Sequence, residues 1–167
     1  MLLIDTDEKL KEFCNCLEKQ PFITVDSEFI REHCYYPKLC LMQVGYDGDA
    51  AIIDPLAHVD LTPFFDILQN PAIVKVFHSG RQDIEIFYNL TGKTPKNVFD
   101  TQIAAMVCGF TENIGDGNLV HDIVHIDLDK SQRLTDWSLR PLDESQLEYA
   151  ILLVWMLQIC RPLSFQI

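Results

Sequence analysis

The order of strand-like and helix-like segments is the feature of this sequence that most restricts its fold. Four β-branched or apolar runs predict strands, at residues 22–29, 39–45, 50–54 and 73–77. A turn at residues 47–49 joins the second and third of these as a hairpin, whereas a helix at residues 82–90 follows the fourth. Paired strands followed by alternating strand and helix predict an α/β fold, with helices flanking a central sheet of mixed strand directions.

The composition fits a single globular domain over residues 1–167. About half of the residues are hydrophobic (48%), enough for a sizeable core. Further helices are expected at residues 6–19, 63–68, 100–109, 117–124 and 143–160. The sequence has no apolar run of about 18 residues, so no membrane span is expected. Its six cysteines show no C-x-x-C spacing, which predicts reduced thiols and a cytoplasmic location.

Asp26 and Glu28 are candidate metal ligands because of their spacing. They end the first predicted strand, and side chains two residues apart on a strand point to the same side. Two carboxylates held side by side repel each other unless a positive charge neutralises them. A hard divalent cation such as Mg²⁺ or Mn²⁺ usually does so in proteins. For such a pair alone, two solvated acids at a strand end remain the alternative.

Two later segments supply further candidates. Asp83 lies in the first turn of a helix that follows a buried strand, where the helix dipole favours an anion facing the crevice at the strand ends. His78, just before it, is expected to be a hydrogen-bonded positioning residue. Tyr149 lies in the last predicted helix, for which Asp143 and Gln146 fit an N-cap and its reciprocal partner. Taken singly, Asp83 could serve only its helix, and Tyr149 could be a core residue.

The net charge of −12 argues against a general electrostatic attraction for nucleic acid. It does not exclude a local one, because bound cations would attract phosphate at the acidic cluster itself. Several basic residues near these segments could meet a phosphate backbone, or could be ordinary surface charges: Arg31, Lys38, Arg81, Lys130, Arg133 and Arg140.

Together, these and neighbouring segments resemble ribonuclease D, of the tyrosine branch of the DEDD superfamily of 3′–5′ exonucleases. The resemblance covers roughly residues 3–150 and looks like a short bacterial form without a C-terminal helical domain. It is carried by Val25-Asp26-Ser27-Glu28-Phe29, Tyr35-Tyr36-Pro37, Leu41-Met42-Gln43-Val44, residues 78–87, Asp100-Thr101-Gln102, residues 128–131, Asp136-Trp137-Ser138 and residues 146–150.

The resemblance implies a ribonuclease H-like fold and hydrolysis of terminal phosphodiesters with two cations per site, Mg²⁺ or Mn²⁺. Asp26 would bridge both cations, Glu28 would bind the first and Asp83 the second, while Tyr149 would orient the attacking water. Four residues are also expected at the substrate: Gln43, His78, Tyr36 and Arg140. Tyr36 could stack on a terminal base or pack under its own loop.

The sequence departs from the family pattern at Leu153. The family places an aspartate four residues after its tyrosine, where it ligates the first metal, but here that position holds a leucine. We expect the first cation to bind weakly and activity to be low or absent. The tail at residues 151–167 is expected to diverge from the family, and a reading-frame shift after Ala150 is one hypothesis for it.

The sequence therefore predicts an impaired 3′–5′ exonuclease that acts on RNA 3′ ends or on single-stranded DNA. The alternative is a catalytically inactive exonuclease-fold module that binds nucleic acid or protein. The apolar C-terminal helix at 143–160 could leave hydrophobic surface exposed, which would favour a homodimer.

Overall fold

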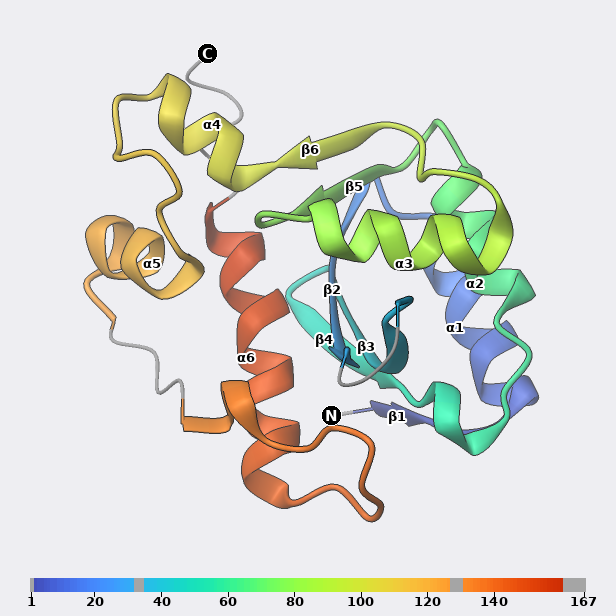
Figure 1. The fold of residues 1–167 in the computed structure, drawn as a ribbon. Coiled ribbons are helices and arrows are strands. Elements are labelled where there is room, and N and C mark those ends of the chain that lie inside the picture. The colour runs from blue at the N-terminus through green and yellow to red at the C-terminus, as the bar shows by residue number, and fades with distance from the viewer. Residues whose placement is uncertain (1, 32–34, 127–130, 161–167) are drawn as a thin grey trace.

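The structure is a computed structural model that describes residues 2–31, 35–126 and 131–160 (Figure 1). Residues 128–130, part of one segment that carries the resemblance, lie outside this range. The helices and strands follow one another as β1 (Leu2–Ile4), α1 (Asp7–Leu17), β2 (Phe22–Ile30), β3 (Lys38–Tyr46), β4 (Asp49–Ile53), η1 (Pro55–Ala57), α2 (Thr62–Gln69), β5 (Val74–Phe77), α3 (Arg81–Thr91), β6 (Val98–Asp100), α4 (Thr101–Val107), α5 (Asp116–Val124), η2 (Ser131–Leu134) and α6 (Glu144–Cys160).

One six-stranded mixed sheet forms the centre, in the order β1-β4-β3-β2-β5-β6. The β2–β3 and β3–β4 pairs are antiparallel, whereas β1–β4, β2–β5 and β5–β6 are parallel. This confirms the predicted α/β class, the mixed sheet and the hairpin. The prediction missed β1 and β6, because three residues are too few to show a strand period.

Helices cover both faces of this sheet (Figure 1). On one face, apolar residues of α1, α2 and α3 pack on the inward side chains of the strands and form the largest core cluster. On the other face, α6 packs over β2, β3 and β4. A smaller cluster joins α6 to α4 and α5. Helix α6 is thus brought beside β2, the strand that carries Asp26 and Glu28.

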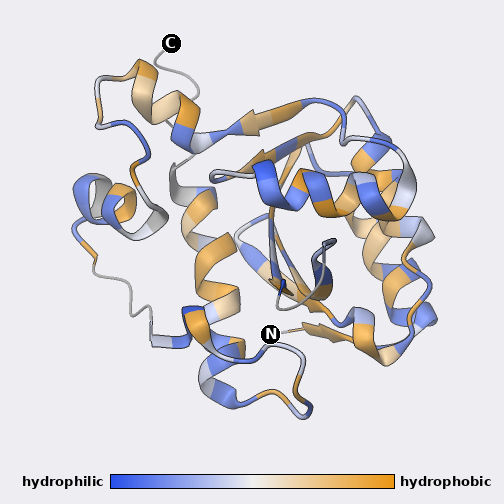
Figure 2. Cartoon of the chain, viewed as in Figure 1, coloured by the Kyte–Doolittle hydropathy of each residue, from blue (hydrophilic) through white to orange (hydrophobic). Residues whose placement is uncertain are grey.

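Helix α6 is apolar on all sides, a pattern typical of a helix with little exposed surface. Figure 2 shows a hydrophilic start to α6, followed by a largely hydrophobic stretch beside the sheet. Ala150, Val154, Met156 and Leu157 are buried, whereas Leu147, Ile151 and Leu152 are half-buried and Trp155 is 38% exposed. The described part of α6 thus buries most of the surface that was expected to be exposed, and a homodimer through it stays a prediction. Within the described ranges, no helix is long and apolar enough to cross a membrane.

Candidate active site

The predicted acids and the tyrosine meet in one cleft. Its volume is about 690 Å³, and its walls include Asp26, Glu28, Asp83 and Tyr149. These residues come from β2, from the first turn of α3 and from α6, elements far apart in the sequence. Packing of α6 across the sheet brings Tyr149 to the strand that carries Asp26 and Glu28.

Strand β2 presents Asp26 and Glu28 on the same side. Asp26 pairs in register with Gln43 of β3 and Glu28 with Leu41, so the two acids alternate with Ser27 as the strand period requires. The register shifts just after Glu28, between Glu28 and Phe29. A bulge of this kind bends a strand and ends regular pairing, which places the acids where the sheet opens into the cleft.

Asp83 is the most deeply buried of the three acids, at 6% exposure. Its Oδ1 accepts a short hydrogen bond from the Ser27 hydroxyl. Burial raises the pKa of the Asp83 carboxyl from 3.8 to about 6; the Ser27 hydrogen bond opposes this rise and the nearby Asp100 charge adds to it. A buried carboxylate that is costly to ionise is stabilised when a cation binds beside it.

Asp100 fixes the turn from which α3 starts. Its carboxylate accepts hydrogen bonds from the backbone N–H groups of Ser79 (3.0 Å), Gly80 (2.9 Å) and Gln102 (2.9 Å). Ser79 has a positive φ of 56°, and a Cβ at Gly80 would lie 2.5 Å from the Cβ of Phe77. The turn is therefore tight, and Asp100 holds it so that Asp83 reaches the cleft. In the sequence, Asp100 stands out only as part of the resemblance to ribonuclease D, although an acid just before a helix is itself a signal for an N-cap.

His78 lies half-buried at the end of β5 and lines the cleft. Its Nδ1 is 2.9 Å from Thr101 Oγ1 and its Nε2 is 3.0 Å from the carbonyl oxygen of Ile114. Because a carbonyl only accepts, Nε2 carries the proton and donates it to Ile114. His78 thus ties β5 to the start of α4 and to the loop before α5, as expected for a positioning residue.

Tyr149 and Trp137 also line the cleft. Their ring centroids are 6.2 Å apart, and both side chains are buried. The helix start behind them is closed by Gln146, whose Oε1 accepts from the backbone N–H of Asp143 (3.0 Å). This is the reciprocal contact that the sequence predicted. Gln146 Nε2 also donates to Thr135 Oγ1 (3.0 Å), which fixes the preceding loop to α6.

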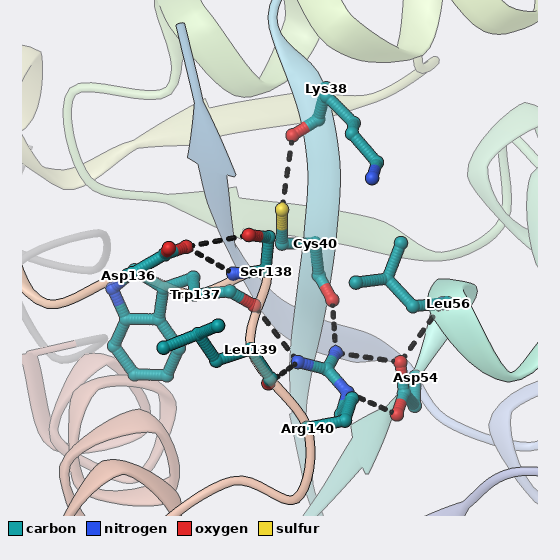
Figure 3. Close-up of polar contacts among 9 residues, drawn as sticks. All are labelled: Lys38, Cys40, Asp54, Leu56, Asp136, Trp137, Ser138, Leu139 and Arg140. Atoms are coloured by element: carbon teal, nitrogen blue, oxygen red, sulfur yellow. Dashed lines mark hydrogen bonds and ion pairs between the residues drawn. The ribbon is translucent and has the colours of Figure 1, made fainter. Parts of the chain in front are cut away.

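The structure does not bring Arg140 to the cleft. Its guanidinium donates to both Asp54 oxygens (2.7 Å each) and to the carbonyl oxygens of Cys40 (2.8 Å), Trp137 (2.9 Å) and Leu139 (2.7 Å). Figure 3 shows the Trp137 ring on the other side of this loop from the guanidinium. All five N–H groups are used inside the protein, so Arg140 clamps the loop of Trp137 to the sheet instead of meeting substrate as expected.

Two other expected substrate residues also lie outside the cleft walls. Gln43 is fully buried in β3 beside Asp26, and neither polar atom of its side chain has a hydrogen-bond partner among the described residues. Tyr36 is 61% exposed and packs edge-on against Tyr35, with centroids 4.9 Å apart. Tyr36 therefore remains available for a contact from outside, whereas Gln43 is enclosed.

Leu153 occupies the wall where the family pattern places an aspartate. It is 9% exposed and lines the cleft with Leu157, one turn further along α6. Among the described residues, no group of three or more His, Cys, Asp or Glu side chains is compact enough to hold a metal ion. The three carboxylates have the chemistry that a hard cation needs, but they share the cleft without converging on one point.

The mixed α/β sheet and its cleft lined by three acids and a tyrosine fit the class of nuclease domains. The chain belongs to the 3′–5′ exonuclease family, whose model matches residues 1–163 and so includes α6. Ribonuclease D of Sphingobium indicum is 53% identical over 151 residues, and that of Zymomonas mobilis is 52% identical. Each match covers 89% of this chain but 39% of the relative, so the chain spans about two-fifths of their length.

Solved structures agree with this assignment. Escherichia coli ribonuclease D, described as an exoribonuclease involved in structured RNA processing, superposes with a TM-score of 0.93 at 40% identity over 98% of this chain and 44% of that one. This match confirms the expected ribonuclease H-like fold. Trypanosoma brucei ribonuclease D in complex with RNA (TM-score 0.85, 24% identity, 96% of this chain and 60% of that one) and Brucella melitensis NrnC with bound Mg²⁺ (0.75, 24%, 89% and 73%) share the fold.

Proposed function

We propose that this chain is the catalytic domain of a 3′–5′ exoribonuclease of the ribonuclease D type, with activity reduced by Leu153. The observation that carries the proposal is the joint placement of Asp26, Glu28, Asp83 and Tyr149 in one cleft. RNA 3′ ends are the proposed substrate, and single-stranded DNA is the second choice.

Asp26, Glu28 and Asp83 would hold the metal, Mg²⁺ or Mn²⁺. A bound cation of this kind lowers the pKa of water and stabilises charge on the phosphate and the leaving oxygen. The Tyr149 hydroxyl orients the attacking water by hydrogen bonding, and its buried ring, packed near Trp137, limits how far it can move. A carboxylate is missing at position 153, so the cation that Glu28 would bind would be held less tightly than the cation that Asp83 would bind.

The second candidate is an inactive module that binds nucleic acid through the same cleft. Leu153 favours it, because an apolar side chain at a ligand position weakens metal binding while leaving the rest of the cleft intact. The two candidates differ in what Asp26→Ala does: this substitution abolishes hydrolysis but leaves binding that needs no metal.

Release of terminal nucleotides from 3′-labelled single-stranded RNA and DNA, in Mg²⁺ or Mn²⁺, tests the proposal. We expect slow release that is faster in Mn²⁺, that Asp26→Ala removes and that Leu153→Asp increases. Ser138→Ala, outside the cleft, is the control for handling and contamination. If the wild-type protein turns over fully and Leu153→Asp does not change the rate, the site is not impaired. If the Leu153→Asp variant releases nucleotides from neither RNA nor DNA, the proposed exonuclease activity is contradicted.

A further inference from the structure

The rim of the cleft at residues 133 and 134, here called the 133–134 rim, carries two side chains that the chemistry above does not use. Both line the cleft. Leu134 is 94% exposed, the most exposed large apolar side chain in the described chain, and Arg133 is exposed beside it. Among the described residues, the Arg133 guanidinium has neither a hydrogen bond nor an ion pair.

The position of this rim is fixed by the protein. The Thr135 backbone N–H and hydroxyl both donate to the carbonyl oxygen of Gln132, at 3.2 and 2.8 Å, which closes the turn η2. Gln146 of α6 donates to the same hydroxyl, and Trp137 is buried two residues further on. The exposure of Leu134 is therefore imposed by anchors on its C-terminal side.

The surroundings of the 133–134 rim select one kind of occupant. Three acids line the cleft, and Phe29 and Ile30, both half-buried, line it as well. A nucleotide chain matches this arrangement, because its bases offer apolar faces and its phosphates offer negative charge. The net charge of −12 repels a phosphate at long range. The unpaired guanidinium of Arg133 at the rim supplies a local attraction that offsets this repulsion.

We propose that the 133–134 rim holds a single-stranded 3′ end, with Leu134 packed against an unpaired base and Arg133 paired with a backbone phosphate. This inference rests on the proposed function and adds strand selectivity to it. In a blunt duplex, the terminal base is held by pairing along its edge and by stacking on its neighbour, so it can enter the cleft beside Leu134 only after the end of the helix opens. Apolar side chains that insert at base steps act in this way on other nucleic acids. The domain is thus expected to prefer single strands over blunt duplexes.

The test measures binding of a fluorescent RNA in Ca²⁺, with the RNA checked to be intact afterwards. We expect Leu134→Ala to weaken binding of a single-stranded 3′ end about tenfold, the loss expected for exposing a leucine side chain, and Leu134→Met to restore it. Binding of a blunt duplex should be weak in the wild-type protein and unchanged by Leu134→Ala. We expect Arg133→Ala to lower the slope of log K against log salt by about 0.7, as loss of one phosphate contact on a single strand should.

Matched controls lie close at hand. Leu139→Ala removes another exposed leucine (63%) from the same loop but outside the cleft, and Lys19→Ala removes an exposed charge beyond the end of α1. Neither should change affinity or salt slope. Equal affinities for Leu134→Ala and Leu139→Ala, or an equal loss on single strands and duplexes, overturn the inference while the nuclease activity stands. If the wild-type protein neither binds nor cleaves RNA, the proposed function fails as well.

Discussion

Replacing Asp83 by asparagine is expected to stabilise the metal-free protein at neutral pH. The substitution keeps the shape of the side chain and an oxygen that can accept from Ser27, but it removes the buried charge. Asp83 has a folded-state pKa of about 6, raised above its ordinary 3.8 mainly by burial. The native protein therefore binds the proton of the Asp83 carboxyl more tightly than the unfolded chain does.

The sign and size of the effect follow from that difference. Between about pH 4 and pH 6 the unfolded chain has lost the proton and the native protein retains it, so the wild-type stability falls as the pH rises. Each pKa unit is worth about 1.4 kcal/mol, so the rise from 3.8 to about 6 corresponds to at most about 3 kcal/mol at pH 7. Asp83→Asn does not titrate and avoids this loss.

The assay is urea unfolding in EDTA from pH 4 to 7.5, for the wild-type protein and Asp83→Asn. The difference in unfolding free energy should grow in favour of Asp83→Asn up to about pH 6 and then stay constant. Asp136→Asn is the control, because hydrogen bonds from Ser138 hold the pKa of the exposed Asp136 below its usual value. Its carboxyl is then ionised in both the folded and the unfolded protein above about pH 4, so the difference for Asp136→Asn should not change with pH across the assay. Saturating Mn²⁺ should reverse the order for Asp83→Asn. A difference that does not change between pH 4 and 7 would refute the reasoning.

Three other outcomes are expected. Leu153→Asp should raise Mn²⁺ affinity at least about tenfold by calorimetry and should lower metal-free stability by about 2–4 kcal/mol, because it places a charge on a buried apolar wall; unchanged metal affinity would contradict the assignment of position 153. Asp100→Asn should weaken the caps on Ser79, Gly80 and Gln102 by about 1–3 kcal/mol in total, and NMR titration should find a lower pKa at Asp83; an unshifted pKa would exclude the charge coupling. Arg140→Met should destabilise by about 3 kcal/mol, because it leaves Asp54 without its partner, and a double-mutant cycle with Asp54→Asn showing no coupling would argue against the clamp.

Periodicity alone was enough for much of this fold. The run at 73–77 predicted β5 although it contains Lys75, which the structure buries completely with its ammonium donating to the carbonyl oxygens of Asn70 and Ile73. The hairpin and α6 also followed from local pattern. The short strands β1 and β6 did not, because they exist only through pairing with β4 and β5.

The site was partly within reach of the sequence for a similar reason. Asp26 and Glu28 lie on the same side of one strand, and Asp83 lies in the first turn of a helix that follows another strand. Their roles could therefore be predicted from the local sequence. Arg140 could not be assigned in this way, since its partner Asp54 lies 86 residues away and only the folded loop shows that the guanidinium is fully used. Arg133 was among the basic residues that the sequence offered as possible phosphate contacts, but Leu134 was missed, because a four-residue turn has no period to detect.

Helix α6 belongs to the core and to the site at once, and this has an evolutionary consequence. If position 153 is a ligand position, as proposed, then exchanging its acid for leucine on this buried wall should increase folding stability while it lowers activity. Where demand for the reaction relaxes, drift can therefore fix the leucine without harm to the fold. The way back is harder, because a returning aspartate costs stability before any cation repays it. Selection for stability thus favours the loss of this ligand over its return. We therefore expect lineages of such nucleases to lose catalysis first through substitutions in α6.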